Sequence, residues 1–334
     1  MKTRVAINGF GRIGRNLFRL LLNHKNIEVI AINDIADNKT MSHLLKYDSI
    51  HGVLPIKCVF DDENIIIDGK NYKFIHEKEI RNIDWKSLNI DIVVEATGKF
   101  KTFEELNEHI EAGAKKVILS APSEVDTIKT VVIGVNENIL DGTETIISNA
   151  SCTTNNAAPM IKVINELCGI NQAYITTIHS YTTDQSLHDQ PHKDLRRARG
   201  ASQSIVPTTT GAAKALTRIF PELEGKIGGC GIRVPVPDGS LTDITFNVKK
   251  DVTIEAINAA FLIASRSNLK GILDYTEDSI VSVDIIGNKN SCLIDAQLTS
   301  VIDKMVKVVG WYDNEIGYSS RIIDLILLIS KPKN

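Results

Sequence analysis

A glycine-rich turn near the start of the chain limits what the first hundred residues can fold into. The short apolar run Arg4–Asn8 is followed at once by Gly9, Gly11 and Gly14 in the sequence G-F-G-R-I-G, and helical spacing of apolar residues begins after Gly11. Glycines at a strand-to-helix turn let the backbone approach a pyrophosphate, which then lies on the helix N-terminus. The pattern predicts a dinucleotide-binding β-α-β unit; the simpler alternative is a tight turn without a ligand.

An acidic residue ends the second predicted strand, which covers residues 28–33. Asp34 follows this strand, 20 residues after Gly14. A carboxylate at this place accepts hydrogen bonds from a ribose 2′-hydroxyl and repels a 2′-phosphate. We therefore expect NAD as the cofactor, against the alternative of an acidic side chain that is merely solvated.

Apolar runs alternate with a helical segment over the rest of the amino-terminal half. Strands are predicted at 91–96, 116–119, 131–135 and 145–148, with a helix over 103–112. Thr97 and Ser120 follow two of these strands, and ligands in such sheets gather at the carboxyl ends of the strands. Residues 50–90 contain alternating runs around a D-G-K turn and predict an antiparallel insertion.

One cysteine stands among small or hydrogen-bonding residues in the segment N-A-S-C-T-T-N, residues 149–155. Cys152 precedes a predicted helix over 157–167, and the dipole and N–H groups of a helix N-terminus favour a thiolate. His179 ends a strand predicted over 174–178, and a reactive cysteine with a distant histidine is typical of thiol catalysis. Spacing alone leaves the alternative of a small buried thiol open. The other histidines are interpreted as ordinary surface or core residues: His24, His43, His51, His76, His109, His188 and His192.

Composition narrows the class of protein. A chain of 334 residues suggests two domains. Five widely spaced cysteines argue against a disulfide framework and a zinc site, and a net charge of −3 gives no general attraction to nucleic acid or to an anionic membrane. The sequence shows no leader pattern and no apolar stretch long enough to cross a bilayer, so we expect a cytoplasmic protein.

Six segments resemble the phosphorylating glyceraldehyde-3-phosphate dehydrogenases in order and spacing, and together they span essentially the whole chain. They are INGFGRIGR, SNASCTTN, HSYTTDQ, TTTGAAKA, RVPVPDGS and WYDNEIGYS. The resemblance implies an NAD-dependent enzyme of glycolysis or gluconeogenesis that converts D-glyceraldehyde 3-phosphate and inorganic phosphate to 1,3-bisphosphoglycerate. The reaction would pass through a cysteine thiohemiacetal and a thioester. A cytoplasmic homotetramer, with no membrane and no obligate nucleic acid as partner, is also implied.

The resemblance further implies roles for single residues. Cys152 would be the nucleophile and His179 its acid–base partner. The residues that would bind the cofactor are Gly9, Gly11, Arg12, Ile13, Asp34, Lys78, Ser120 and Asn314, with Tyr318 over the nicotinamide ring. Those that would bind the substrate phosphate are Thr182, Arg197 and Arg233. Those that would bind the attacking phosphate are Ser151, Thr153, Thr210 and Gly211.

Three positions depart from the family pattern. Gln190 precedes Pro191 where NAD-preferring members usually carry leucine, which weakens the argument for NAD. Asn156 replaces a second cysteine and so removes an oxidation partner. Lys78 stands where an arginine often contacts the cofactor, which puts its role in doubt.

The fold class expected is α/β, with two domains. A Rossmann-type dinucleotide-binding domain would comprise residues 1–150 and 314–334, the C-terminal helix returning to it. An α+β catalytic domain with a mostly antiparallel sheet would comprise residues 151–313. Two other functions stay open: an erythrose-4-phosphate dehydrogenase, which shares the scaffold but releases the acid, and a non-catalytic binding paralogue.

Overall fold

The computed structural model describes residues 2–123 and 125–331, and the chain divides into two compact units. The first unit consists of Met1–Val131, Asn138–Ala150 and Ser319–Asn334, and the second of Val132–Glu137 and Ser151–Tyr318. The domain bounds expected from the sequence stay a prediction. The compact units differ from them because residues 132–137 and 314–318 belong to the second unit.

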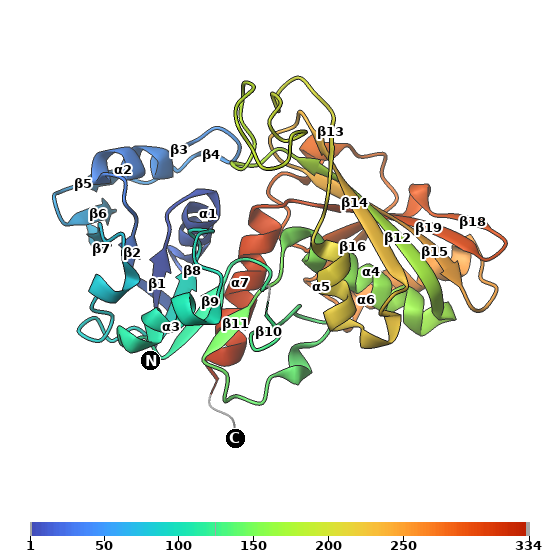
Figure 1. The fold of residues 1–334 in the computed structure, drawn as a ribbon, viewed down its shortest axis with the longest axis horizontal. Coiled ribbons are helices and arrows are strands. Elements are labelled where there is room, and N and C mark those ends of the chain that lie inside the picture. The colour runs from blue at the N-terminus through green and yellow to red at the C-terminus, as the bar shows by residue number, and fades with distance from the viewer. Residues whose placement is uncertain (1, 124, 332–334) are drawn as a thin grey trace. The chain divides into compact units, whose positions relative to one another are not determined.

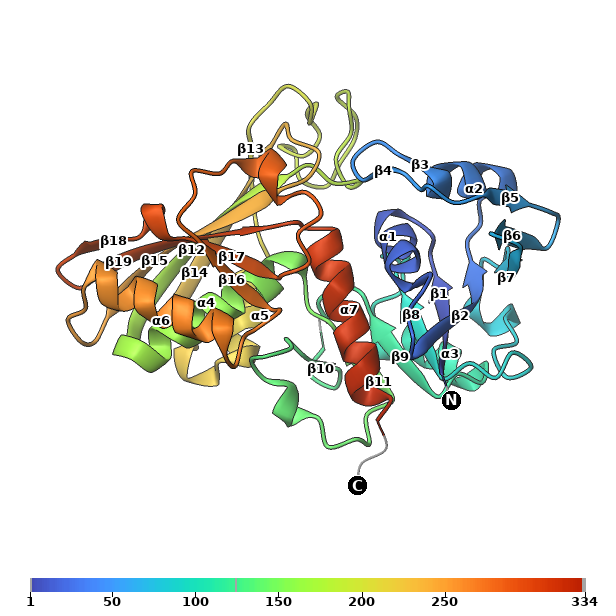
Figure 2. The ribbon, with the colours of Figure 1, turned by 180° about the vertical axis from the view of Figure 1, so that it is seen from behind.

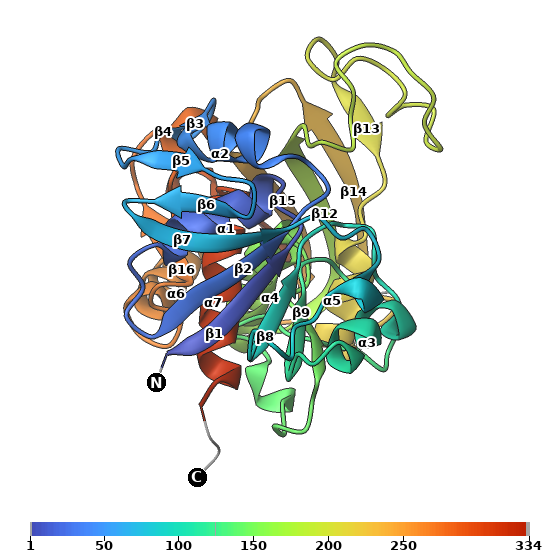
Figure 3. The ribbon, with the colours of Figure 1, turned by 90° about the vertical axis from the view of Figure 1, so that its left-hand side faces the viewer.

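Among the described residues, the first unit is built on a nine-stranded sheet with the order β10-β11-β9-β8-β1-β2-β7-β6-β5. Pairing is parallel from β10 through β7, as a Rossmann-type unit requires, and Figure 3 shows β7, β2, β1, β8 and β9 side by side. The strands are β1 (Thr3–Asn8), β2 (Ile27–Asn33), β5 (Cys58–Phe60), β6 (Asn64–Ile67), β7 (Lys70–Ile75), β8 (Ile92–Glu95), β9 (Lys116–Leu119), β10 (Lys129–Thr130) and β11 (Ile146–Ser148). A separate pair joins β3 (Tyr47–Asp48) to β4 (Gly52–Val53).

The strand order reverses at β1, which determines where a ligand can lie. β1 pairs with β2 on one side and with β8 on the other, so Asn8, Asn33 and Glu95 stand next to one another at the carboxyl ends. Crevices at such a reversal are the usual ligand sites of open α/β sheets. Helices α1 (Arg12–Leu21), α2 (Asn38–Lys46) and α3 (Phe103–Glu111) also belong to the first unit and are labelled in Figure 1.

The predictions for the flanking segments have different outcomes. The antiparallel insertion is confirmed, because β5 pairs with β6 and β6 with β7 in antiparallel register. The strand predicted at 131–135 is wrong. Strand β10 ends at Thr130, and the side chain of Asn136 accepts the Val132 N–H at 2.7 Å, so the chain turns there instead of extending.

The second unit contains, over the residues that are described, an eight-stranded sheet with the order β13-β14-β12-β15-β19-β17-β16, and β18 pairs with β19. The pairs β12–β14 and β16–β17 are parallel and the others antiparallel, which confirms the expected mostly antiparallel sheet. The strands are β12 (Ile170–Ser180), β13 (Val206–Thr208), β14 (Ile227–Val234), β15 (Ser240–Val248), β16 (Leu273–Thr276), β17 (Cys292–Asp295), β18 (Ser300–Ile302) and β19 (Met305–Tyr312).

Helices cover one face of this second sheet, as Figure 2 shows. They are α4 (Cys152–Cys168), α5 (Ala212–Ile219) and α6 (Ile254–Arg266). Strand β12 shows the resulting alternation, because Ala173 and Ile175 are buried while Tyr174 between them is exposed. The opposite face of the sheet therefore carries the exposed side chains.

Helix α7 (Ile316–Ile329) confirms the final helix expected from the sequence, and its residues from Ser319 onward belong to the first unit. Short 3-10 helices occur at Ile80–Asn82, Glu137–Ile139, Pro221–Leu223, Ser282–Ile285 and Ala296–Leu298. Among the described residues, the structure contains no helix with both the length and the apolar character needed to span a membrane.

Candidate active site

A groove of about 360 Å³ lies at the carboxyl ends of β1, β2 and β8 in the first unit. Gly9, Gly11, Asp34 and Lys78 line it, as does Thr97. The carboxylate of Asp34 is fixed there, because its two oxygens accept the backbone N–H groups of Phe10 at 2.7 Å and Ala36 at 3.0 Å. The groove thus brings together four of the residues expected to bind the cofactor.

Two glycines make this groove possible. A Cβ atom on Gly9, whose φ is 96°, would lie 2.5 Å from the backbone nitrogen of Thr97. A Cβ on Gly14 would lie 2.1 Å from the carbonyl oxygen of Gly9. Only glycine allows so close an approach of turn, helix and neighbouring strand, and this is the backbone cradle that a dinucleotide pyrophosphate needs. The residues present therefore fit NAD.

A buried polar network lies beneath the groove. The carboxylate of Glu95 accepts hydrogen bonds from Asn8 Nδ2 at 2.5 Å, from the Thr97 N–H at 2.8 Å and from the Thr97 hydroxyl. Trp85 donates to His109 Nδ1 at 3.0 Å, so in the neutral ring His109 Nε2 carries the proton and donates to Glu95 at 3.2 Å. These bonds hold the ends of β1 and β8 together.

The remaining cofactor candidates of the first unit lie outside the lining of this groove. Arg12 opens helix α1, and its guanidinium forms a two-pronged pair with Asp48 at 2.5 and 3.1 Å. Ile13 follows it in the helix and is half-buried. Ser120 follows β9, where its N–H donates to the carbonyl of Glu95 at 2.9 Å. In this structure the Arg12 side chain therefore serves an internal ion pair.

Cys152 is the first residue of α4 in the second unit. Ser151 precedes it as the N-cap, and the Ser151 hydroxyl accepts the Thr154 N–H at 3.1 Å. The expectation of a thiol at a helix N-terminus is confirmed, and the helix begins five residues earlier than periodicity indicated. The preceding Ala150 has a φ of 56°, a left-handed conformation that a residue with a Cβ adopts at some cost.

His179 and Cys152 are brought together by the fold. His179 Nε2 lies 3.4 Å from Cys152 Sγ, and His179 Nδ1 lies 2.7 Å from the carbonyl oxygen of Ser180. The Ser180 carbonyl can only accept, and Arg233 Nη1, which also lies 2.9 Å from Nδ1, has this same carbonyl as its acceptor. The contacts are therefore satisfied with the proton on Nδ1, and the neutral ring presents Nε2 as an acceptor. The imidazole is thus oriented to take a proton from the thiol or from a group bound to it.

The pKa shifts show that both groups are neutral in this state. Burial raises the pKa of the Cys152 thiol, although the Arg233 guanidinium and the N–H and hydroxyl of Thr153 act in the opposite direction. Burial, together with Arg233, lowers the pKa of His179 to about 3. The backbone N–H groups at the start of the helix do favour the thiolate, as expected, but the loss of hydration outweighs them in this state.

Two arginines create a positive field next to this pair. Arg233, near the end of β14, donates from Nη1 to the Ser180 carbonyl at 2.9 Å, and the same Nη1 lies 2.9 Å from His179 Nδ1. Arg197 lies in the loop after β12 and also lowers the pKa of His179. It donates to Asp184 and, at 2.9 Å, to the Thr208 hydroxyl. Arg197 and Arg233 thus share one electrostatic neighbourhood, and half-buried Thr182 follows β12 by two residues.

The residues expected to hold the attacking phosphate lie at two helix N-termini. Thr153 is in the first turn of α4, and its hydroxyl is 2.9 Å from the Tyr312 hydroxyl. Gly211 is the N-cap of α5, and the neighbouring Thr210 hydroxyl accepts the Ala212 N–H at 3.2 Å. Helices α4 and α5 pack against each other, which places both N-termini in one unit. Backbone N–H groups at such termini favour an anion.

The remaining candidates for the cofactor site and two of the positions that depart from the family pattern lie in the second unit. Asn314 is 6% exposed, and its Oδ1 lies close to two serine hydroxyls. Tyr318 is buried in the first turn of α7. Gln190 is exposed in the loop after β12, where its side chain donates to Ser186. Asn156 is buried, and its Nδ2 donates to the carbonyls of residues 291, 310 and 311 at 3.3 Å each.

Several residues next to Cys152 and His179 were not predicted from the sequence. The Tyr312 hydroxyl bridges Thr153 and Thr177 at 2.9 Å each, and its ring meets the His179 ring edge-on with centroids 5.9 Å apart. Ser180 and Ser240 contact Asn314. Tyr312, Ser240 and Ser180 do lie in three of the six family-like segments, W-Y-D-N-E-I-G-Y-S, R-V-P-V-P-D-G-S and H-S-Y-T-T-D-Q, and this was the available signal.

Two family models and several named relatives match this chain. The family model described as the NAD binding domain of glyceraldehyde 3-phosphate dehydrogenase matches residues 3–103, and the one described as its C-terminal domain matches residues 151–314. Glyceraldehyde-3-phosphate dehydrogenase of Geobacillus stearothermophilus is 51% identical over 332 residues, covering 99% of both chains. Glyceraldehyde-3-phosphate dehydrogenase of Mycobacterium avium is 51% identical, over 99% of both chains. Glyceraldehyde-3-phosphate dehydrogenase 1 of Bacillus subtilis (strain 168) is 49% identical, also over 99% of both chains.

Proposed function

This chain belongs to the glyceraldehyde-3-phosphate dehydrogenase family and is an NAD-dependent oxidoreductase of that type; from this premise we propose which of its residues perform each step. Cys152 Sγ attacks the aldehyde carbon of glyceraldehyde 3-phosphate. The single observation that carries this assignment is the distance of 3.4 Å between Cys152 Sγ and His179 Nε2, because it gives the thiol proton an acceptor.

His179 moves the protons of the reaction. The depressed pKa of His179 leaves Nε2 unprotonated at neutral pH. Because Nε2 lies 3.4 Å from Sγ, it accepts the thiol proton as the carbon–sulfur bond forms. The transient imidazolium protonates the carbonyl oxygen, which leaves a neutral thiohemiacetal and a neutral imidazole. When hydride leaves the carbon, Nε2 accepts the hydroxyl proton and a thioester remains. NAD supplies the hydride acceptor when it is bound.

The anion pockets complete the cycle. Arg233, Arg197 and Thr182 hold the phosphate of the substrate, and Arg233 is suited to this because its guanidinium is largely withdrawn from water beside His179. Ser151, Thr153, Thr210 and Gly211 hold inorganic phosphate at the N-termini of α4 and α5. A phosphate oxygen attacks the thioester carbon, the sulfur of Cys152 leaves, and 1,3-bisphosphoglycerate forms.

The cofactor contacts come from residues of the first unit and from Asn314 and Tyr318 of the second. Gly9 and Gly11 admit the pyrophosphate, with Arg12 and Ile13 at the start of α1 beside it, and Asp34 holds the adenosine ribose. Ser120, Asn314 and Tyr318 serve the nicotinamide end. Lys78 lines the groove with an exposed ammonium that can lie against the cofactor from the solvent side.

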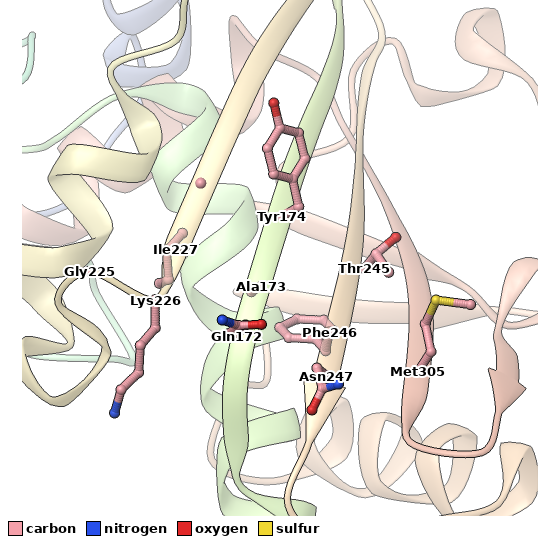
Figure 4. Close-up of a pocket in the computed structure, with 11 residues that line it drawn as sticks. Gln172, Ala173, Tyr174, Gly225, Lys226, Ile227, Thr245, Phe246, Asn247 and Met305 are labelled. Carbon is pink, nitrogen blue, oxygen red and sulfur yellow. The ribbon is translucent and has the colours of Figure 1, made fainter.

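The protein acts in the cytoplasm as a homotetramer. A reducing compartment suits a chain with five free cysteines, one of them the nucleophile. The outer face of the second sheet supports assembly, because Tyr174 and Met305 are 53% and 47% exposed there. Figure 4 shows them on β12 and β19, with Thr245 of the intervening strand β15 between them.

Two measurements test the proposed roles. Cys152→Ser should abolish turnover while leaving NAD binding intact. Limiting iodoacetate should label Cys152 first by mass spectrometry, because His179 Nε2 at 3.4 Å can accept the thiol proton as the new carbon–sulfur bond forms. Cys58→Ser, Cys168→Ser, Cys230→Ser and Cys292→Ser should each keep substantial activity. First labelling of another cysteine, with activity retained, would refute the assignment.

Phosphate dependence separates this function from an erythrose-4-phosphate dehydrogenase. Steady-state NADH formation from glyceraldehyde 3-phosphate should rise from near zero to saturation as inorganic phosphate is added. A hydrolysing enzyme would turn over without phosphate and would prefer erythrose 4-phosphate. Phosphate-independent turnover with the longer sugar would reverse the choice.

A further inference from the structure

Two buried serine hydroxyls meet one oxygen of Asn314. The Ser180 hydroxyl donates to Asn314 Oδ1 at 2.9 Å and the Ser240 hydroxyl donates to the same atom at 2.7 Å. Both serines are fully buried. They stand at the end of β12 and at the start of β15, so the sheet itself determines where the two hydroxyls lie.

The direction of these hydrogen bonds follows from the other contacts of the serines. The Ser180 backbone N–H donates to Ser240 Oγ at 3.1 Å, so that oxygen is already an acceptor and its own proton points elsewhere. Asn314 Oδ1, at 2.7 Å, is the nearer acceptor; Ser180 Oγ is 3.5 Å away. With two donors on Oδ1, the amide has one favoured orientation, and its Nδ2 is left to donate to something else.

Ser180 also contacts the acid–base group through its backbone. Its carbonyl oxygen accepts His179 Nδ1–H at 2.7 Å and Arg233 Nη1 at 2.9 Å. One residue therefore holds the imidazole and the Arg233 guanidinium with its carbonyl and the Asn314 amide with its hydroxyl. Bonds of this kind between buried groups are costly to leave unmade.

We propose that Ser180 and Ser240 are positioning residues that fix the side-chain amide of Asn314 with Oδ1 toward the protein, so that Nδ2 donates to the carbonyl oxygen of the nicotinamide carboxamide. This inference rests on the proposed role of Asn314 at the nicotinamide end of NAD. It makes Ser180 the shared support of cofactor binding and of proton transfer.

A double-mutant cycle tests whether the serines act through Asn314. Ser180→Ala and Ser240→Ala should each raise the Kd for NAD about five- to tenfold, the range for loss of one hydrogen bond to a buried polar group. Asn314→Ala should raise it at least as much. Adding Ser240→Ala to Asn314→Ala should change the Kd by less than about twofold, because the group that the hydroxyl holds is already gone.

A cofactor analogue tests the orientation of the amide. 3-Acetylpyridine adenine dinucleotide keeps the carbonyl oxygen of the ring substituent but lacks its N–H groups. With Nδ2 as the donor, wild-type protein should bind this analogue within about threefold of NAD. A flipped amide would present Oδ1 and would lose its partner, so binding about tenfold weaker than NAD would overturn the proposal.

The controls keep the outcomes distinct. Ser265→Ala removes a half-buried hydroxyl that bonds the Leu262 carbonyl on α6, and it should leave the Kd for NAD unchanged. If the fold-changes in the Kd for NAD caused by Ser240→Ala and by Asn314→Ala simply multiplied in the double variant, positioning through Asn314 would be contradicted. Wild-type turnover with glyceraldehyde 3-phosphate is measured in the same series, and if it were absent the proposed function would fail, independently of the serines. Ligand-free thermal unfolding of each variant checks that it folds.

Discussion

The imidazole of His179 is kept neutral by burial and by a positive neighbour. Loss of water and the Arg233 guanidinium both disfavour its charged form, and they outweigh the Ser180 carbonyl, which favours it. A base that is already unprotonated at neutral pH can accept a proton without first losing one. The same desolvation keeps the thiol of Cys152 protonated until a substrate arrives.

The depressed pKa of His179 predicts a pH dependence of stability. The unfolded chain binds a proton on this residue near pH 6.5, whereas the folded chain does so only near pH 3. Stability contributed by the neutral imidazole is therefore complete above about pH 6.5 and declines as pH falls toward 3, by about 1.4 kcal/mol per pH unit. His179→Asn should flatten the dependence of unfolding free energy on pH in this window, measured by urea denaturation. The exposed His188→Asn is the control, and an unchanged slope in His179→Asn would contradict the shift.

Asp34 predicts the choice between NAD and NADP. Its carboxylate is held in the groove by two backbone N–H groups and would repel a 2′-phosphate, so kcat/KM for NAD should exceed that for NADP at least about tenfold. Asp34→Asn should reduce this preference about tenfold, because the repulsion disappears. Steady-state kinetics with both cofactors measure it. Glu79→Gln, in the same groove, should change the ratio much less; equal efficiency of the wild type with both cofactors would be incompatible with this role of Asp34.

Helix α4 positions Cys152, the proposed nucleophile, by the way it begins. Ala150 turns the chain through a left-handed conformation, and Ser151 then caps the helix, so Cys152 is the first helical residue. The cap satisfies the Thr154 N–H and fixes the first turn. Thr253 caps α6 in the same way, accepting the Ala256 N–H at 3.2 Å, but α6 carries none of the proposed catalytic residues.

These two caps allow a matched experiment. Ser151→Ala and Thr253→Ala should each lower the free energy of unfolding by about 1 kcal/mol, because each leaves a helical N–H without its cap. Only Ser151→Ala should lower kcat/KM for inorganic phosphate, by about tenfold, since Ser151 also belongs to the proposed phosphate pocket. Denaturant unfolding and initial-rate kinetics compare the pair. A similar loss of activity in Thr253→Ala would assign the effect to stability alone.

The two faces of the second sheet differ in how far they are covered, and this difference affects where another subunit could bind. Helices α4, α5 and α6 cover one side, while Tyr174 and Met305 on the other are about half exposed. Exposed aromatic and thioether side chains on one face of a sheet favour contact with another sheet of the same kind. A two-fold contact uses the same patch on both subunits, so this surface would join two chains, and a tetramer requires a further interface.

A homotetramer should have a mass about four times that of the 36.8 kDa chain, as measured by sedimentation analysis. The double variant Tyr174→Lys and Met305→Lys should shift the mass to smaller species, because like charges would meet across a two-fold contact. Ile263→Lys is the control, since Ile263 is 66% exposed on helix α6 and away from that face. A mass of one chain in the wild type would refute the tetramer.

The sequence alone determined the parts that depend on local chemistry. The turn at Gly9–Gly14 follows from backbone conformations that only glycine allows, and the helix after Cys152 follows from 3.6-residue periodicity. Periodicity failed at 131–135, where a side-chain bond from Asn136 turns an apolar run away from the sheet. The residue roles themselves came from the family resemblance and stay predictions.

Only the tertiary structure decided how distant groups meet. Ser180 and Asn314 are 134 residues apart, and Thr153 and Tyr312 are 159 apart, so their hydrogen bonds depend on strand register within one sheet and on α4 packed against it. Burial is likewise a property of the whole fold, and it raises the pKa of the Cys152 thiol against the N–H groups that favour the thiolate. A sequence pattern identifies which groups can react, but desolvation and register determine their protonation and their partners.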